Sequence, residues 1–277
     1  MPVHSRPYSH SNHTSHPTKP RSTKNKMITN IDYIPCSQIN LHRSEIPTAQ
    51  FYYSVESTDD MPYIAFVQEP YCVRGNPKQL PGNGVTFYHK SPNGINPRAI
   101  LTISNNLADH SFFQMQFSDR DTATCSIELP KSKLYVSSIY MDGNTQDPPE
   151  TFLKLAEHCL HHKHGLIIGT DSNSHHSAWG NRVSDTRGNK LLACLAQAGL
   201  LWLNNGKHTW KRNDQSSAID LTLRNEFAPE INGWDTNPDF SLSDHVLIEF
   251  IIRLNDDKIK VRRSIRKNVT GTHTELQ

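Results

Sequence analysis

The 277-residue sequence lacks any apolar run long enough to cross a lipid bilayer, and its first residues lack the apolar core of a secretory signal peptide. Net charge is also nearly absent, because 29 Lys and Arg residues almost balance 27 Asp and Glu residues to give a formal charge of +2. The sequence therefore gives no chain-wide electrostatic reason to bind nucleic acid. We expect a soluble, intracellular protein without membrane attachment.

Cysteine is scarce and its spacing suggests no pairing. The five cysteines are odd in number, are widely separated and include no C-x-x-C pair. This pattern argues against a zinc ribbon and against a disulfide framework. It is typical of reduced thiols in a reducing compartment.

Apolar side chains make up only 35% of the chain, and the shortfall lies at its two ends. Residues 1–30 have almost no aliphatic side chains and cannot offset their chain entropy by burial, so we expect a disordered N-terminal tail. Residues 254–277 contain a cluster of lysines and arginines without a following apolar period, which predicts a basic C-terminal tail. We interpret this tail as a solvated linker, with a phosphate contact or a nuclear address as the alternative. Residues 31–253 then form one domain.

The central region alternates short β-rich apolar runs with two helical stretches, which predicts an α/β fold. The predicted strands cover residues 63–67, 99–103, 134–139, 165–168, 208–210, 219–223 and 246–252. The predicted helices cover residues 149–162 and 189–198. The first helix ends in the string HCLHHKHG, in which His158 and His162 share a face and have acceptable spacing for metal ligands. We favour a solvated face for these histidines, because cations suit a helix C-terminus.

The string GTDSNSHHSAWGN, residues 169–181, follows an apolar strand and places Asp171 two residues before Asn173. In an extended chain these two side chains point to the same side. A carboxylate that holds a metal or activates water, next to an amide that donates to a phosphate, suits phosphodiester chemistry. An ordinary turn is the alternative, because Asp and Asn are frequent in turns.

Several other polar groups lie at the ends of predicted strands. They are Asn40, Glu69, Tyr140, Asp220, Asp244 and His245. Each has a simple explanation as a cap, a loop acid or a satisfied core carboxylate. If they converge with Asp171 at one sheet edge, however, the carboxylates would repel one another unless a divalent cation or a histidinium compensated them.

These residues in this order resemble the endonuclease/exonuclease/phosphatase superfamily, which includes deoxyribonuclease-I-like nucleases and apurinic/apyrimidinic endonucleases. More narrowly, the strings QINLHRS, VQEPY, SSIYMD and DSNSHHSAWG resemble the apurinic-type endonuclease domain of non-LTR retrotransposons. The resemblance covers residues 33–252. It implies a four-layer α/β/β/α sandwich in which two mixed β-sheets pack face to face.

The resemblance also implies an activity. The chain would be a Mg²⁺-dependent endonuclease, with Mn²⁺ as a substitute, that nicks double-stranded DNA in the nucleus. The nick would leave a 3′-hydroxyl for target-primed reverse transcription by a downstream reverse transcriptase domain. Two alternatives stay open: a phosphoesterase of the same fold that acts on another substrate, and a catalytically silent retroelement remnant that binds nucleic acid.

Residue roles follow from the resemblance position by position. Glu69 and Asn40 would bind Mg²⁺, a hard cation that prefers oxygen ligands, and Asp244 would complete the metal side. Asp171 would orient or deprotonate the attacking water, while Asn173 would hold a nonbridging phosphate oxygen. The sequence departs from many superfamily members two residues after Asn40, where His42 replaces an acid that could give a second metal ligand.

The remaining roles concern protons and DNA contacts. His245 would bond the phosphate or share in proton transfer, Asp220 would fix its tautomer, and Tyr140 would donate its hydroxyl to the phosphate. The sequence leaves open whether Asp171 or His245 is the general base. Candidate DNA contacts follow the catalytic string, with Trp179 as a lid on the local core the alternative for that residue. The candidates are His176, Trp179, Arg182 and Arg187.

Overall fold

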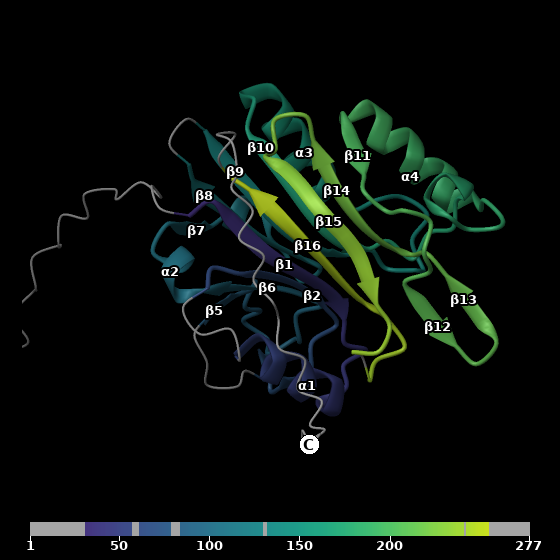
Figure 1. Ribbon diagram of the computed structural model, residues 1–277, viewed down its shortest axis with the longest axis horizontal. Helices are drawn as coiled ribbons and strands as arrows, with labels where there is room; N and C mark the ends of the chain where they lie inside the picture. The colour runs from purple at the N-terminus through teal and green to yellow at the C-terminus, as the bar shows by residue number, and fades with distance from the viewer. Residues whose placement is uncertain (1–30, 57–60, 79–83, 130–131, 241, 255–277) are drawn as a thin grey trace, which may run out of the picture.

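Two six-stranded mixed β-sheets form the centre of the computed structural model (Figure 1). The structure describes residues 31–56, 61–78, 84–129, 132–240 and 242–254. The predicted disordered tail and all but the first residue of the predicted basic tail lie outside the described residues. No helix in the described ranges has the length and apolar content needed to span a membrane.

The first sheet has the order β15-β16-β1-β2-β6-β5. Only β1 and β2 run parallel, while the other neighbours are antiparallel. Its strands are β1 (Tyr33–Asn40), β2 (Ile64–Gln68), β5 (Gly84–Phe87), β6 (Ala99–Ser104), β15 (Glu230–Asn237) and β16 (Leu247–Arg253).

The second sheet has the order β11-β14-β10-β9-β8-β7. Its parallel pair, β9 and β10, is connected by the helix α3 (Glu150–His162), as parallel strands require a crossover. The strands are β7 (Ser111–Phe113), β8 (Thr122–Glu128), β9 (Lys133–Tyr140), β10 (Gly165–Asp171), β11 (Leu200–Trp202) and β14 (Asp220–Asn225).

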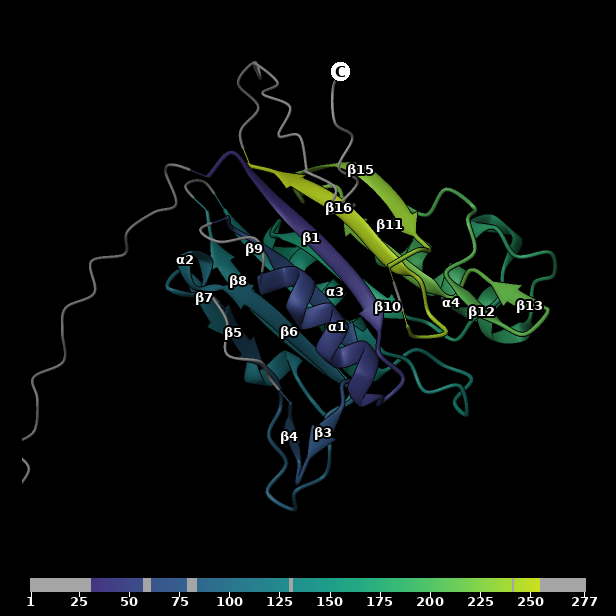
Figure 2. The ribbon, with the colours of Figure 1, turned by 60° about the horizontal axis from the view of Figure 1, so that its bottom comes forward.

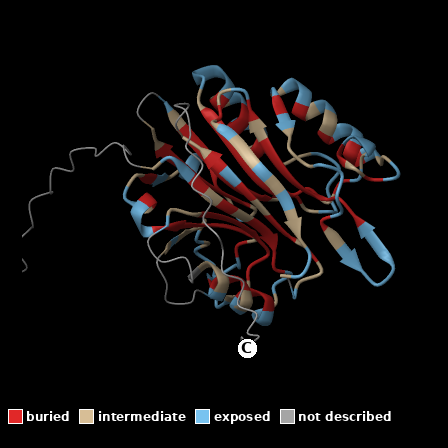
Figure 3. Cartoon of the chain, viewed as in Figure 1, coloured by how far each residue is buried: buried red, intermediate tan, exposed pale blue. Residues whose placement is uncertain are grey.

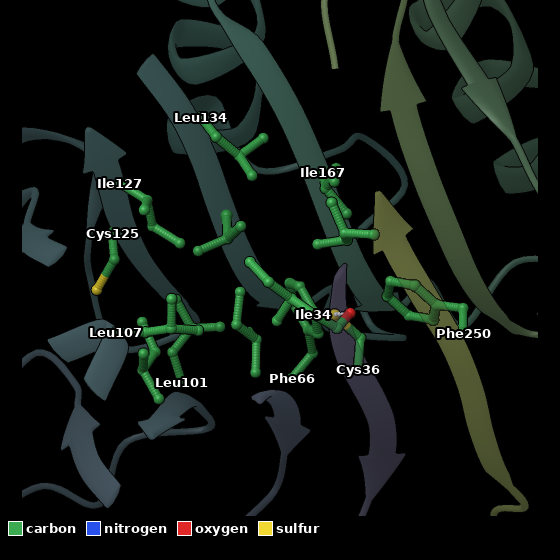
Figure 4. Packing of buried hydrophobic residues seen from close by; sticks show 14 of the residues in the cluster. Ile34, Cys36, Phe66, Leu101, Leu107, Cys125, Ile127, Leu134, Ile167 and Phe250 are labelled. Atoms are coloured by element: carbon green, nitrogen blue, oxygen red, sulfur yellow. Dashed lines mark hydrogen bonds between the residues drawn. The ribbon is translucent and has the colours of Figure 1, made fainter. Parts of the chain in front are cut away.

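The two sheets pack face to face through alternate residues of their strands. Figure 4 shows the apolar side chains of this interface, with Phe66 and Phe250 from the first sheet and Leu134 and Ile167 from the second. All four belong to one buried cluster. Because side chains alternate along a strand, the residues that share a face with Ile167 lead along β10 to Asp171 at the strand end. The interface core and the polar end of the sandwich therefore lie on the same face.

Helices cover the outer face of each sheet. The helix α1 (Glu45–Glu56) lies on the first sheet (Figure 2) and packs Phe51 against Ile39 and Val67. The helices α3 and α4 (Thr186–Gln197) pack on the second sheet around a separate buried cluster. Figure 3 shows the consequence, with buried residues along the central strands and exposed residues on the outer helix faces. The predicted four-layer α/β/β/α sandwich is confirmed.

Short elements complete the chain around this frame. Two hairpins project from it: β3 (Cys72–Val73) with β4 (Asn76–Pro77), and β12 (Trp210–Arg212) with β13 (Gln215–Ser217) (Figures 1 and 2). The remaining short elements are α2 (Asn105–Ala108) and the 3-10 helices Met115–Phe117 and Ser177–Trp179.

Most element boundaries differ from the sequence-based prediction by one to three residues, and two of these differences involve side-chain hydrogen bonds. The strand predicted over 208–210 begins only at Trp210, and the Thr209 hydroxyl accepts the N–H groups of Ile219 and Asp220. The helix predicted from residue 189 begins at Thr186, because Asp185 caps it by accepting the N–H of Gly188. At the start of the helix, a side-chain hydrogen bond to the backbone therefore overrides the apolar pattern.

Candidate active site

Three polar residues lie in one row at the end of the second sheet. Asp171, the last residue of β10, is in register with Asp220 of β14 on one side and with Tyr140 of β9 on the other. The strands bring these residues together although they are far apart in the sequence. Asp171 and Asp220 are almost fully buried, at 2% and 1% exposure.

The first sheet contributes Asn40, the last residue of β1. Its Nδ2 atom donates a 2.8 Å hydrogen bond to Oδ2 of Asp171 and so joins the two sheets at this end. Its Oδ1 atom accepts the backbone N–H of His42 at 2.7 Å. Both ends of the Asn40 amide are therefore bonded, and the group is held in one orientation.

Two buried glutamines fix the sheet spacing beneath this row. Gln38 donates to the carbonyls of Thr170 and Leu221, both at 3.2 Å. Gln68 donates to Ser138 Oγ at 2.9 Å and to the carbonyl of Gly169 at 3.0 Å. Each glutamine crosses from the first sheet to the second. These supports were not anticipated from the sequence, where a glutamine inside an apolar strand gives no signal of what it bonds.

His245 and Asp220 form a buried pair. The Nδ1 atom of His245 lies 3.0 and 2.9 Å from the two carboxylate oxygens of Asp220. Burial lowers the pKa of His245, but the charge and hydrogen bond of Asp220, together with the charges of Asp171 and Asp244, raise it to about 9. The ring is therefore an imidazolium at neutral pH, with Asp220 fixing its orientation.

Asp171 is shifted in a direction useful for proton transfer. Burial, followed by the charge of Asp220, raises the pKa of Asp171 to about 7, while His245 and the hydrogen bonds from Asn40 and Asn173 oppose the shift. A carboxyl group with this pKa both loses and gains a proton near neutral pH. Such a group suits general acid–base chemistry.

Asn173 lies in a left-handed conformation with a φ of +47°, directly beside Asp171. Its backbone N–H donates to Asp171 Oδ1 at 3.1 Å, and its Nδ2 donates to the carbonyl of Met141 at 3.0 Å and to Asp171 Oδ2 at 3.4 Å. The turn expected as the simple alternative for the D-x-N triplet is thus present, and it also places the Asn173 amide next to the carboxylate.

Tyr140 stays protonated in this environment. Burial, followed by the charges of Glu69 and Asp171, raises the pKa of its hydroxyl to about 12. The Arg98 guanidinium lies over its ring, 4.7 Å from the centroid. A hydroxyl held in this way can donate a hydrogen bond but does not supply a negative charge.

The predicted metal ligands provide hard oxygen atoms that already face cations or donors. Glu69 is 8% exposed, has a φ of +44° and pairs with the Arg43 guanidinium. Asp244 accepts the indole N–H of Trp210 at 3.1 Å and lies 3.7 Å from Nδ1 of His42. Carboxylate oxygens that face a guanidinium, an imidazole and an indole N–H fit a site for a divalent cation that prefers oxygen ligands.

A second group of side chains also has the composition of a metal site. Among the described residues, Asp171, Asp220 and His245 are the one group of three acidic, histidine or cysteine side chains whose donor atoms lie within 4.8 Å of one another. However, Nδ1 of His245 is bonded to Asp220, and a protonated imidazole has no lone pair to offer a metal. This group therefore suits proton transfer better than metal ligation.

Two of the four predicted DNA contacts are corrected by the structure. Trp179 is fully buried and packs in the apolar cluster under α3 and α4, so the alternative of a lid on the local core holds. Arg187 is 7% exposed, and its guanidinium donates to the carbonyls of Ser172 at 3.0 Å and Asp142 at 2.7 Å. Neither side chain presents a surface to DNA.

The other two candidates lie nearer to solvent. His176 is half-buried and accepts the N–H of Ala178 through Nδ1, while Arg182 is exposed. Arg182 lines a cavity of about 380 Å³ together with His175 and Trp210. The structure is compatible with a substrate contact at Arg182, which stays a prediction.

Two arginines support the site without having been singled out for that purpose. Arg98 pairs with both oxygens of Asp121, each at 2.5 Å, and with Asp142 at 2.7 Å. It thereby connects β6 of the first sheet to loops of the second. Arg187 holds the segments around Asp142 and Ser172 together, as given above. The sequence around an arginine in a loop does not show that it holds other loops together, because its hydrogen-bond partners come from distant segments.

Comparison with known proteins agrees with this geometry. Residues 134–249 match the family model described as endonuclease-reverse transcriptase. The endonuclease domain of TRAS1, a telomere-specific non-LTR retrotransposon, is 25% identical with a TM-score of 0.65, over 80% of this chain and 99% of that one. The chain has the endonuclease/exonuclease/phosphatase fold.

More distant structures share this superfamily fold. The apurinic/apyrimidinic endonuclease LMAP from Leishmania major is 10% identical with a TM-score of 0.59, over 80% of this chain and 88% of that one. The catalytic domain of Xenopus laevis APE2 is 13% identical with a TM-score of 0.58, over 81% of this chain and 94% of that one. No curated protein matches the chain in sequence. The resemblance inferred from the sequence motifs is confirmed.

Proposed function

We propose that this chain is a Mg²⁺-dependent endonuclease that hydrolyses phosphodiester bonds in double-stranded DNA and leaves a 3′-hydroxyl. The observation that carries the proposal is the buried group of Asp171, Asp220 and His245, in which a carboxyl with a pKa of about 7 lies beside an imidazolium. Similarity to the TRAS1 endonuclease domain supports a nuclease rather than another phosphoesterase.

The two shifted groups take different roles. Asp171 accepts the proton of the attacking water, because its pKa allows it to be unprotonated at neutral pH. His245, which is protonated below a pKa of about 9, is unsuited to be the base and instead donates to the phosphate or returns a proton to the leaving oxygen. Asp220 keeps the ring oriented through Nδ1.

Glu69, Asn40 and Asp244 would hold Mg²⁺, or Mn²⁺ in its place. When bound, the cation supplies positive charge that stabilises the phosphate and the leaving oxygen. Before it binds, Arg43 and His42 lie against Glu69 and Asp244, and both of these basic side chains are 58% exposed. They can therefore move aside without rearranging the sandwich.

Tyr140 and Asn173 bind the phosphate in this proposal. The Tyr140 hydroxyl remains a donor because its pKa is about 12. The Nδ2 atom of Asn173 exchanges its long 3.4 Å contact with Asp171 for a nonbridging oxygen and keeps its bond to the Met141 carbonyl. Both donors meet negative charge that grows in the transition state.

The biological role that fits these features is the first step of retrotransposition. The 3′-hydroxyl at the nick primes reverse transcription by a downstream reverse transcriptase domain, in the nucleus where the target DNA lies. The family description that names an endonuclease together with a reverse transcriptase supports this role.

The test is nicking of a supercoiled plasmid by the purified chain with Mg²⁺, with EDTA, and with the Asp171→Asn variant in parallel. We expect open circles only with Mg²⁺ and the unmutated chain, and a decrease of at least about a hundredfold in rate for Asp171→Asn. Glu157→Ala, on the exposed face of α3, is the matched acidic control and should cleave normally. Extension of the nick by a DNA polymerase without phosphatase treatment reports the 3′-hydroxyl.

Other outcomes point to the alternatives. Release of inorganic phosphate without nicking would favour a phosphatase of the same fold. DNA binding that is independent of metal, with no turnover by folded protein, would favour a silent remnant. Normal cleavage by the folded Asp171→Asn variant would overturn the assignment of the base.

A further inference from the structure

Three histidines meet at the end of α3, away from the candidate active site. His158 and His162 lie one turn apart on the helix, and His164 precedes the first residue of β10. Lys163 between them adopts a left-handed conformation with a φ of +53°, which turns the chain back so that His164 lies beside the last helical turn. The ring centroids are 4.6 Å apart for His158 and His162, 5.7 Å for His162 and His164, and 6.0 Å for His158 and His164.

These separations suit a shared metal ion. Three imidazoles bound tetrahedrally with metal–nitrogen distances of about 2.0–2.1 Å have ring centroids roughly 5 Å apart. Among the described residues, only the catalytic trio has its donor atoms already gathered within 4.8 Å, so binding here requires the rings to rotate. His162 is exposed and His164 is half-buried, which leaves their rings room to do so.

The surroundings of the three rings favour a cation. The C-terminus of α3 carries the negative end of the helix dipole. Of the charged side chains nearby, Lys133 pairs with Glu128 at 3.0 Å.

One ring also has an orienting partner. The Tyr135 hydroxyl, in a 5% exposed side chain, lies 3.1 Å from Nε2 of His158. That contact leaves Nδ1 of His158 for a metal, and a hydrogen bond at the second nitrogen is the usual arrangement for a metal-bound histidine. His158 is therefore half-buried against Tyr135, and the solvated face expected from the sequence describes His161 and His162 only.

We propose that His158, His162 and His164 bind one divalent transition metal ion of the zinc type, separately from the Mg²⁺ centre. The set of imidazole nitrogens selects a borderline-soft cation, whereas Glu69, Asn40 and Asp244 offer oxygen to a hard one. His164 and Asp171 lie at opposite ends of β10, about 20 Å apart at the rise of a strand. The bound ion ties the end of α3 to the start of β10.

Zinc binding to the full chain, after treatment with EDTA, tests this proposal. The chain contains 16 histidines, so total zinc does not identify the site, and the informative quantity is the difference between variants. We expect His162→Ala and His164→Ala each to bind one zinc equivalent fewer than the unmutated chain, by calorimetric titration and by metal analysis. His161→Ala, one residue away on the exposed helix surface, is the matched control and should keep the full stoichiometry.

Thermal unfolding gives a second readout that does not depend on cleavage. At a hundredfold excess over its Kd, zinc should raise the Tm by roughly 5–10 °C in the unmutated chain and in His161→Ala. The rise should be lost in His162→Ala and His164→Ala, with each variant compared with its own Tm without metal. Equal zinc stoichiometry and equal Tm shifts in all four proteins would overturn the proposal.

Discussion

Single side chains at the end of the sandwich differ in charge because their neighbours differ. Asp171 and Asp220 are adjacent, in register and equally buried, yet only Asp220 has His245 as a hydrogen-bond partner. Asp220 therefore lies against the positive charge of the ring, while burial and then the negative charge of Asp220 raise the pKa of Asp171. Two identical residue types thus acquire different roles from one ion pair.

Removal of the Asp220 charge should shift the pH dependence of cleavage to lower pH. In the unmutated chain we expect the rate to rise as Asp171 loses its proton at a pKa of about 7 and to fall as His245 loses its proton at a pKa of about 9. Asp220 raises both pKa values, so Asp220→Asn should lower both limits of the bell-shaped profile as well as the maximal rate. Nicking rates measured from pH 5 to pH 10 with both proteins check this expectation. An unshifted profile in the folded variant would contradict the proton assignments.

At the scale of elements, the side chain of Arg98 holds loops between strands together. Arg98 begins the approach to β6, but its side chain binds acids that precede β8 and follow β9. Tyr140 lies under the same guanidinium, so a shift of Arg98 moves a predicted phosphate ligand as well. A planar group with several donors is needed here, because two carboxylates are bound in fixed directions.

Arg98→Lys should lower the free energy of unfolding by about 1–3 kcal/mol at pH 7, because an ammonium group cannot pair with both acids in this geometry. The exposed Arg120→Lys is the control, and its free energy of unfolding should change little.

The contribution of Asp142 should also depend on pH. The N–H of Asn144, followed by Arg98, lowers the pKa of Asp142 from 3.8 to about 2. The stability from this acid is therefore present above pH 4 and is lost as the pH falls toward 2, so the difference between the variant and the unmutated chain should shrink in urea titrations at low pH. A difference that stays constant with pH would contradict the role of the ion pairs.

At the scale of the whole molecule, the distance between the two sheets decides whether the site forms. Asn40, Gln38 and Gln68 reach across that distance with hydrogen bonds of 2.8 to 3.2 Å. Such bonds tolerate little separation of their partners. The sheets approach closely because Gly169 faces Phe66, where a Cβ atom would lie 2.7 Å from the Cβ of Phe66.

Gly169→Ala should therefore push the sheets apart and affect stability and cleavage together. We expect a loss of about 1–3 kcal/mol in the free energy of unfolding, typical of an overpacked core, and a clear decrease in nicking rate. Gly143→Ala is the control for stability, because its added Cβ would meet ordinary contacts at 3.7 Å or more. Urea unfolding followed by circular dichroism measures the first effect. Unchanged stability of Gly169→Ala would show that the sheets can adjust at this point.

Much of the frame could be predicted from local pattern. The apolar runs predicted β2, β6, β9, β10, β14 and β16 to within two or three residues at each end, and the helical period predicted α3. The helix α1 was missed because its sequence EIPTAQFYYSVE has no clear apolar stripe, although Phe51 packs on the first sheet. Short edge strands such as β5 and β7 were missed because they have few residues and few buried side chains. The longer strands β1, β8 and β15 were missed because polar residues interrupt their apolar patterns.

Some features of the candidate site could be predicted from the local sequence, and others depend on contacts between distant segments. The residue types and their positions at strand ends are written in the sequence, and these were enough to select Asn40, Glu69, Asp171, Asp220 and His245. Which of them touch depends on strand order and register, and these arise from pairing between segments as far apart as residues 40 and 171. The burial of Trp179 and Arg187 could not be predicted either, because the exposure of a side chain depends on how the whole molecule packs. Chemical identity is local, whereas distance, charge state and access result from the three-dimensional arrangement, because each depends on neighbours that the chain supplies from elsewhere.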